Sequence, residues 1–195
     1  MYNLSDIIRF KKDHGLKHKG SIAYEYLTAQ SPPYLKTYDS CEIDFQCLQD
    51  IVKKRCTQEA RSDTFVIHVR AFDVINKVPD ADVFLKIIKK YGLHTRFTNC
   101  LLLYGNHQKG LKQQKVKESE NYLEKLKNKI EELNLNCELV SKSADEDFIS
   151  LATAKCYIAG YRGFGWLAAC INPNEVIWDI QDPPAFPWLV NKDFK

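Results

Sequence analysis

Two short segments of the chain combine residue types that bind anions. The first, residues 68–73 (HVRAFD), follows an apolar run and brings three polar side chains into one loop. Residues two positions apart in a strand point to the same side, so His68 and Arg70 are expected to face one ligand. The Arg70 guanidinium offers a planar fork of donors for phosphate oxygens, and the His68 imidazole can donate to a phosphate or ribose or act as a base. The alternative is a histidine with an internal partner and an arginine paired with Asp73 or another carboxylate.

The second segment, residues 160–166 (GYRGFGW), joins a predicted strand to a predicted helix. Its three glycines let the backbone approach a ligand closely and leave N–H groups exposed. The helix start carries no carboxylate to neutralise its positive end, so it is predicted to bind an anion. The predicted anion-binding residues are Arg162, Gly163, Phe164 and Gly165. The alternative is that the glycines serve only a tight turn and helix–sheet packing.

A different kind of contact is predicted at residues 145–147 (DED), which open another helix. Carboxylates in a first helical turn interact favourably with the helix dipole. They would repel a phosphate but can accept hydrogen bonds from ribose hydroxyls or from a base. Asp145 is therefore a candidate contact for the nucleoside part of a ligand.

Strand-like and helix-like runs that alternate from residue 64 onward must position these groups. Apolar runs predict strands at 65–69, 100–104, 137–140, 156–159 and 175–178. Helical spacing of apolar residues predicts helices from Pro79 to near Gly92, over about 116–133, from 145, and over 166–171. The alternation predicts an α/β fold, a Rossmann-like parallel sheet with helices on both faces. Ligands of such sheets bind outside the carboxyl ends of the strands, where both anion-binding segments are expected.

The first part of the chain has a different pattern. Residues 1–61 have a basic opening and a Pro32-Pro33 break, followed by an amphipathic stretch through Phe45, Leu48 and Ile51 that predicts one helix. We expect residues 1–61 to form a small N-terminal region and residues 62–195 to form the Rossmann-like nucleotide-binding domain.

Composition narrows the class of protein. The chain is 45% hydrophobic and 27% charged with a net charge of +3, as expected of a globular domain and not of a nucleic-acid-binding protein. Its seven cysteines include no C-x-x-C pair, so neither a zinc site nor a disulfide framework is predicted, and a reducing compartment such as the cytoplasm is expected. No stretch approaches the roughly 20 apolar residues of a membrane span. We therefore expect a soluble protein without a bound metal.

Residues 68–73 at the end of the first predicted strand resemble the H-x-R-x-x-D type motif of fucosyltransferase-like glycosyltransferases with GT-B architecture. Residues 147–154 (DFISLATA) are similar to that family's D-x-x-x-L-x-x-A helix. Residues 157–169 are similar to the strand, small-residue loop and alanine-rich helix that follow it. The order and separation agree with a donor-binding half, and the resemblance covers residues 65–178, somewhat over half the chain.

The resemblance implies transfer of a sugar such as fucose from a nucleotide-diphosphate donor, most often GDP-linked, to a glycan or other hydroxyl acceptor. It implies inversion, without a metal ion or a cofactor beyond the donor. Arg70 would neutralise the diphosphate leaving group, and His68 would touch the donor's phosphate or ribose. The Gly163–Trp166 segment would bind the phosphates. Asp73 would orient the first loop and is the candidate for the general base.

The chain departs from the family's pattern at several points. Ala71 and Phe72 stand where the family commonly has a second arginine or a Ser-Gly pair. Glycines at 163 and 165 replace a hydroxyl-bearing loop, so backbone N–H groups and Arg162 would substitute. A GT-B enzyme has two Rossmann halves, whereas about 60 residues precede the first strand here, so the acceptor half is expected to be reduced or absent. The alternative function is a non-catalytic nucleotide or nucleotide-sugar binding module that needs a partner; an oligomer is compatible with either.

Overall fold

The computed structural model describes residues 22, 25, 45–57, 60–72, 75, 78–105, 110–159 and 163–178 of the 195-residue chain. The chain divides into two compact units, one formed by Met1–Thr57 with Asp182–Lys195 and the other by Gln58–Gln181. The second unit contains the sheet and every described residue of the predicted site.

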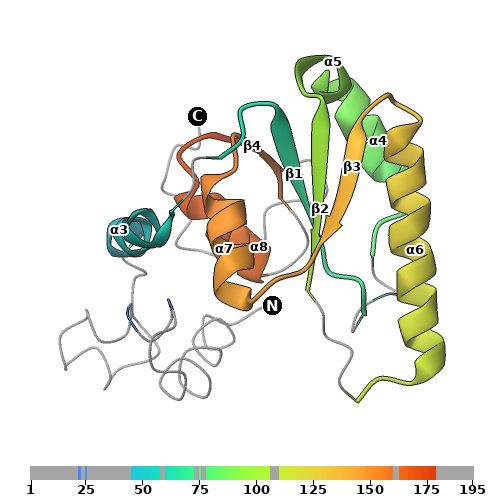
Figure 1. The fold of residues 1–195 in the computed structure, drawn as a ribbon, viewed down its shortest axis with the longest axis horizontal. Coiled ribbons are helices and arrows are strands. Elements are labelled where there is room, and N and C mark those ends of the chain that lie inside the picture. Colours follow the sequence, from blue (N-terminus) through green and yellow to red (C-terminus); the bar gives the residue numbers. More distant parts are fainter. Residues whose placement is uncertain are drawn as a thin grey trace. The chain divides into compact units, whose positions relative to one another are not determined.

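Within the described residues, five parallel strands form one sheet (Figure 1). The strands lie in the order β3-β2-β1-β4-β5, so the chain first builds outward from β1 and then returns to the other side of β1. This arrangement confirms the predicted Rossmann-like α/β fold. The strands are β1 (Thr64–Val69), β2 (Asn99–Tyr104), β3 (Asn136–Val140), β4 (Cys156–Ile158) and β5 (Glu175–Ile177).

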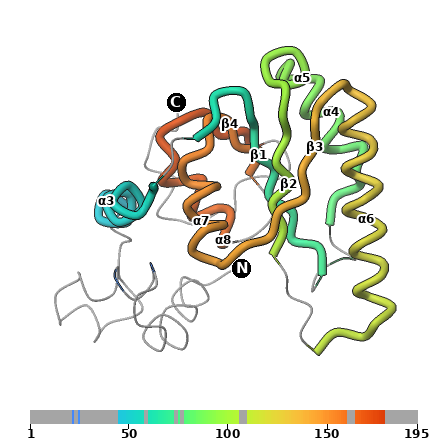
Figure 2. Tube along the Cα trace, in the orientation of Figure 1, coloured from blue at the N-terminus to red at the C-terminus, as the bar shows by residue number. Residues whose placement is uncertain are grey.

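Helices cover both faces of this sheet. The helices α4 (Ala81–Lys90) and α6 (Gln113–Glu131) lie on one face, whereas α7 (Ala144–Thr153) and α8 (Gly163–Ile171) lie on the other (Figure 1). Figure 2 follows the chain from β3 into α7, the connection that carries it from one half of the sheet to the other.

The two faces explain why β1 is apolar without alternation. All six residues of β1 are buried. Phe65, Ile67 and Val69 belong to the main core together with buried residues of α4 and α6. Val66 and His68 point to the opposite face, which α7 and α8 cover. A strand buried on both sides needs a continuous hydrophobic run, and the polar exceptions in this one are Thr64 at its start and His68.

Local signals fix the ends of α4. The side chain of Asp80 caps the helix by accepting a hydrogen bond from the N–H of Asp82 at 3.0 Å. At the other end Gly92 has φ +61°, a left-handed conformation that glycine adopts without the steric cost of a side chain. The helix boundaries predicted from Pro79 and Gly92 are therefore confirmed to within two residues.

A single helical turn, α5 (Leu93–Arg96), follows and was not predicted from the sequence. Arg96 makes two hydrogen bonds to the Glu175 carboxylate of β5, one of them from Nη1 to Oε1 at 3.1 Å. A four-residue turn has no periodicity to detect, and this long-range ion pair helps to hold it in place. The Arg96 guanidinium also keeps the pKa of Glu175 below its ordinary value.

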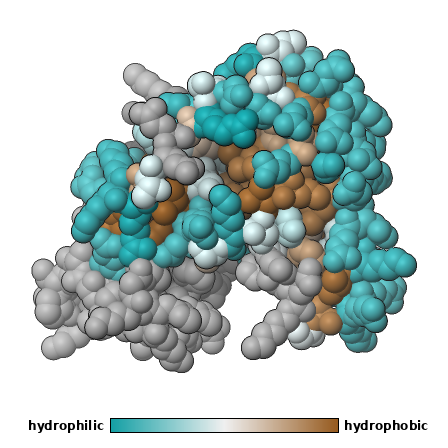
Figure 3. All heavy atoms as spheres, viewed as in Figure 1, coloured by the Kyte–Doolittle hydropathy of each residue, from teal (hydrophilic) through white to brown (hydrophobic). Residues whose placement is uncertain are grey.

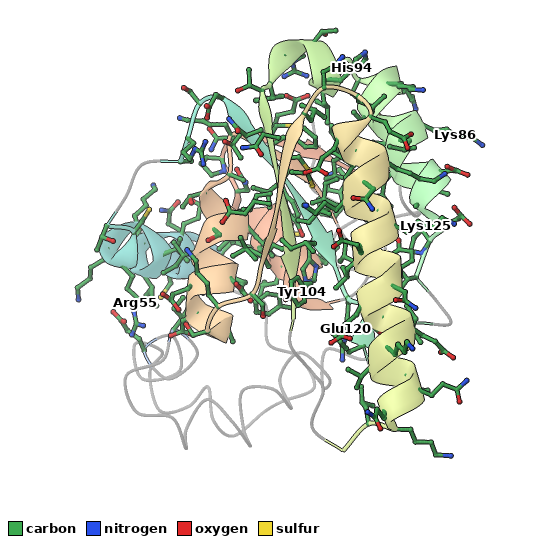
Figure 4. All side chains as sticks on the ribbon, turned by 45° about the vertical axis from the view of Figure 1, so that its right-hand side comes forward. Arg55, Lys86, His94, Tyr104, Glu120 and Lys125 are labelled. Atoms are coloured by element: carbon green, nitrogen blue, oxygen red, sulfur yellow. The ribbon has the colours of Figure 1, made fainter. Side chains whose placement is uncertain are left out.

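Charges are interleaved along the outer surfaces of α4 and α6. Figure 3 shows this side of the molecule as largely hydrophilic, and Figure 4 shows Lys86 and Lys125 projecting from the two neighbouring helices. The Lys129 ammonium, hydrogen-bonded to Asp82, lowers the pKa of that carboxyl, and Lys125 and Lys86 add to the effect. None of the described helices is both long and apolar enough to cross a lipid bilayer.

Three cysteines within apolar runs of the sequence, Cys100, Cys137 and Cys156, lie in the core. Cys100 and Cys137 are register partners on β2 and β3, and both are buried. Burial raises the pKa of the Cys100 thiol, and the neighbouring Cys137 thiol adds to this effect. Burial also raises the pKa of Cys156 on β4 to about 12. Cys100 and Cys156 therefore remain protonated and unreactive at neutral pH.

The smaller unit contributes one described helix, α3 (Phe45–Arg55). Leu48, Ile51 and Val52 are its buried residues, which confirms the amphipathic helix predicted before the first strand. Near its end, Arg55 Nε donates to Glu25 Oε2 at 2.8 Å.

A buried asparagine that follows α8 joins this end of the helix to the last turn of α7 and the residue after it. The Nδ2 of Asn172 donates to the carbonyl oxygens of Leu151 at 2.8 Å and Ala154 at 3.0 Å. Its Oδ1 accepts from the N–H of Asn174 at 2.7 Å. One side chain therefore satisfies three backbone groups and fixes where α8 ends.

Asn172→Ala should lower the free energy of unfolding by about 2 kcal/mol, because it removes these three hydrogen bonds to backbone groups. Asn174→Ala is the matched control, since the side chain of the exposed Asn174 makes two longer bonds, of 3.3 Å to the Thr153 carbonyl and 3.2 Å to the Ala154 carbonyl. Its loss should stay below about 0.5 kcal/mol. Urea unfolding of both variants measures the difference, and equal losses would contradict this role of Asn172.

Candidate functional site at the β1–β4 boundary

The boundary between β1 and β4 is where the order of the strands in the sheet reverses. After β1 it proceeds to β2 and β3 on one side, and β4 and β5 are then added on the other side. In open parallel sheets, ligands bind at such a boundary, outside the carboxyl ends of the strands. These ends form the lower edge of the sheet in Figure 1, and Tyr104 marks the end of β2 in Figure 4.

The two central strands separate before β1 ends. β4 is in register with β1 only at Val66–Tyr157 and Ile67–Ile158. His68 and Val69 continue beyond this point and remain in register with β2 alone. The backbone after β4 turns instead to β5, where the N–H of Ala159 donates to Ile177 at 2.9 Å. Arg70 directly follows β1, so it leaves the sheet where the two strands have already parted.

The first turn of α8 packs onto His68. The His68 side chain is only 6% exposed, and its ring centroid lies 5.8 Å from that of Phe164. A Cβ on Gly165 would lie 2.5 Å from His68 Nδ1 and 2.7 Å from Tyr157 Oη. Gly165 therefore permits a backbone approach that any side chain would prevent. This is the helix–sheet packing considered as the alternative role of the glycines, and it also brings the two predicted anion-binding segments into contact.

The start of α7 lies beside the start of α8. The rings of Phe148 and Phe164 meet edge to face with centroids 5.4 Å apart. Both helices begin at the carboxyl edge of the sheet, because each follows a strand of the same parallel sheet. The acidic residues that open α7 and the uncharged opening of α8 are thus neighbours.

The helix start that was predicted to attract an anion differs from the expectation in one respect. α8 begins at Gly163, three residues before the predicted start at Trp166, so Gly163, Phe164 and Gly165 form its first turn. This turn contains no acidic residue. The first four N–H groups of a helix have no intrahelical acceptor, so the positive end of α8 is not neutralised from within.

The opening of α7 is anchored by a capping box. Ser143 accepts from the N–H of Glu146 at 3.3 Å, and Glu146 Oε2 accepts from the N–H of Ser143 at 3.1 Å. Hydrogen bonds from the Ser143 hydroxyl and from the Ser143 N–H to this carboxylate hold the pKa of Glu146 below its ordinary value. Asp145, the predicted nucleoside contact, lies half-buried in the same turn. The carboxylate of Glu146 is thereby committed to the helix and not to a ligand.

Asp147 is the most deeply buried carboxylate of this turn. It is 5% exposed, and its Oδ1 accepts a hydrogen bond from the N–H of Lys142 at 3.1 Å. Burial, with a smaller contribution from the Glu146 carboxylate, raises its pKa from 3.8 to about 6 against the opposing effect of the Lys142 hydrogen bond. Asp147 therefore titrates close to neutral pH.

Asp147→Asn should stabilise the protein at pH 8 by about 1 kcal/mol and bring no gain at pH 4. Between pH 4 and 6 the folded state binds more protons at Asp147 than the unfolded state, so the free energy of unfolding of the wild type falls as pH rises. Asparagine can keep the Lys142 bond without a charge. Urea unfolding at both pH values, with Asp145→Asn as control, measures the effect; a pH-independent difference would contradict it.

The structure thus brings together His68, Phe164 and Gly165, with Arg70 directly after β1 and Asp145 in the first turn of the neighbouring α7. Asp73 and Arg162 lie outside the described residues. Sequence reasoning missed Tyr157 and Asp147 as parts of this arrangement. The hydroxyl of Tyr157 in the apolar run 156–159 was an available signal, since a buried phenol needs a hydrogen-bond partner. Asp147 could not be separated from Asp145 without the orientation of the helix.

Within the described residues, no group of three or more His, Cys, Asp or Glu side chains is arranged to hold a metal ion. No protein-family model, curated protein or solved structure matches the chain. The chemistry of the site must therefore be inferred from its own residues.

Proposed function

We propose that the chain is a glycosyltransferase that takes a sugar from a nucleotide-diphosphate donor, with GDP-linked donors favoured, and transfers it to a hydroxyl acceptor with inversion. The diphosphate would lie at the β1–β4 boundary. The observation that supports this most is the contact of His68 with Phe164 and Gly165. It joins the arginine-containing end of β1 to the uncharged start of α8, as one anion site requires.

The chemistry asked of this site is stabilisation of a departing anion. An acceptor hydroxyl attacks the anomeric carbon, the bond from that carbon to the diphosphate oxygen breaks, and the hydroxyl proton passes to a base. Negative charge then accumulates on the diphosphate. The Arg70 guanidinium and the N–H groups at the start of α8 are suited to receive it, because such donors need no reorganisation during the reaction. Asp73 is the candidate base.

The neighbouring start of α7 suits the nucleoside part of the donor. Its acidic first turn favours hydroxyl and N–H donors over phosphates, whereas the first turn of α8 favours phosphates. The start of α7, which favours the nucleoside, and the start of α8, which favours phosphates, are neighbours, as the two ends of a nucleotide diphosphate require. Asp145 is the proposed acceptor from ribose or base.

Ligand-induced stabilisation is the first test. The full chain is heated with GDP, UDP, ADP or CMP, and we expect GDP to raise its unfolding temperature most. A ligand at 100 times its dissociation constant adds about 2.7 kcal/mol, which such a measurement resolves easily. Stabilisation by none of the nucleotides would contradict the proposed site.

Turnover separates the two functional alternatives. The full chain is incubated with a panel of nucleotide sugars, and release of free nucleotide is followed with and without sugar acceptors. Hydrolysis or transfer from one donor supports the glycosyltransferase. Nucleotide binding without turnover by any donor supports instead a binding module that needs a partner.

A further inference from the structure

Tyr157 places a phenol in the middle of a strand that is buried on both faces. Its side chain is 0% exposed, and the neighbouring strand residues Cys156 and Ile158 are equally buried. The Tyr157 hydroxyl donates to the carbonyl oxygen of Gly165 at 3.1 Å. A buried phenol is tolerated when its hydroxyl has such a partner. The bond connects β4 directly to the first turn of α8.

The hydrogen bond from Tyr157 to Gly165 is relevant to the proposed site because it acts at the start of α8. Gly165 is the third residue of α8, so its carbonyl belongs to the same first turn as the N–H groups proposed to face the diphosphate. The same glycine packs against both Tyr157 and His68, with no space for a side chain on either contact. The start of α8 is thus held against β4 and β1 by one hydrogen bond and one close approach.

We infer that Tyr157 is a positioning residue of the diphosphate site, which orients the first turn of α8 through the carbonyl of Gly165. This inference rests on the proposed function. Tyr157 would touch no ligand itself; it sets where the N–H groups of that turn point. Small misplacements of such donors weaken binding, because hydrogen bonds depend steeply on distance and angle.

A purely structural role is the competing explanation, and the chain offers a matched control for it. The Tyr122 hydroxyl donates to the carbonyl oxygen of Pro79 at 2.7 Å, on the opposite face of the sheet. Tyr122→Phe and Tyr157→Phe each remove one phenol-to-carbonyl hydrogen bond. Only Tyr157→Phe removes it from the start of α8.

The test is calorimetric titration of GDP into the full chain, beside urea unfolding of the same samples. Tyr157→Phe should raise the dissociation constant for GDP about fivefold, the ratio that one net hydrogen bond corresponds to. Tyr122→Phe should leave the constant unchanged. Tyr157→Met, which fills most of the space without a donor, should raise it in the same way.

Arg70→Ala separates failure of this inference from failure of the proposed function. If Arg70→Ala weakens GDP binding and Tyr157→Phe does not, the positioning role is overturned and the site remains. Equal weakening by Tyr157→Phe and Tyr122→Phe also overturns it, because loss of stability would then be the cause. If neither the wild type nor any variant binds GDP, the proposed function itself fails.

Discussion

Arg70→Ala is expected to lower kcat/KM for donor turnover by about 100-fold or more, the largest effect on activity among these predictions. Arg70 directly follows β1, beyond the last residue that is in register with β4, and its guanidinium is proposed to neutralise charge that forms on the departing diphosphate. Charge stabilisation of this kind acts more strongly in the transition state than in the bound donor. The loss should therefore appear mainly in kcat, with a smaller change in KM.

Two control variants show whether the loss of turnover is specific to the guanidinium of Arg70. Arg70→Lys keeps the positive charge but not the planar fork, so an intermediate loss is expected. Arg96→Ala removes an arginine whose guanidinium pairs with Glu175, away from the proposed site, and should leave kcat/KM unchanged. Equal turnover by the wild type and Arg70→Ala would remove Arg70 from the mechanism.

Gly165→Ala is expected to lower the free energy of unfolding by about 2 kcal/mol, although alanine is the better helix former by about 1 kcal/mol. The added methyl group would lie 2.5 Å from His68 Nδ1 and 2.7 Å from Tyr157 Oη, and both side chains are buried. Neither can move without disturbing its neighbours, so α8 must shift away from the sheet. Urea unfolding measures the loss, and GDP titration should show weaker binding in the same variant.

A double variant tests whether the steric conflict with Tyr157 causes this loss of stability. Combining Gly165→Ala with Tyr157→Phe removes one of the two atoms that the methyl group would meet. The double variant should therefore lose less stability than the sum of the two single variants, because the sites are in contact. Simple additivity would show that the steric conflict with Tyr157 is not the source of the loss.

The sheet and its long helices could be predicted because their signals are local. The apolar spacing of α6 and the Pro79 and Gly92 boundaries of α4 depend on residues within a few positions of one another. The start of α8 could not be placed in this way. Gly163 and Gly165 have a low helix propensity. The packing of Gly165 against His68 of β1 and Tyr157 of β4 outweighs it.

The same distinction applies to the candidate site. His68, Arg70 and the glycine segment could be assigned to one edge of the sheet, since parallel strands end together. Burial of His68 under α8 depends on β1 continuing past the end of β4, which only the strand register reveals. The hydrogen bond from Tyr157 to Gly165 depends on the same register. Residue types therefore indicate the chemistry, whereas the relative lengths of the strands decide which groups meet.

The buried thiols of Cys100 and Cys137 can report how often the sheet opens between β2 and β3. An alkylating reagent needs access to the sulfur atom, and burial of both side chains denies that access in the closed sheet. The half-buried Cys47, Cys56 and Cys170 have partial access. The rate at which Cys100 and Cys137 are modified, followed by time-resolved mass spectrometry, would therefore measure how often β2 opens from β3. Slower modification in the presence of a nucleotide would show that ligand binding stabilises the sheet as far as these two strands.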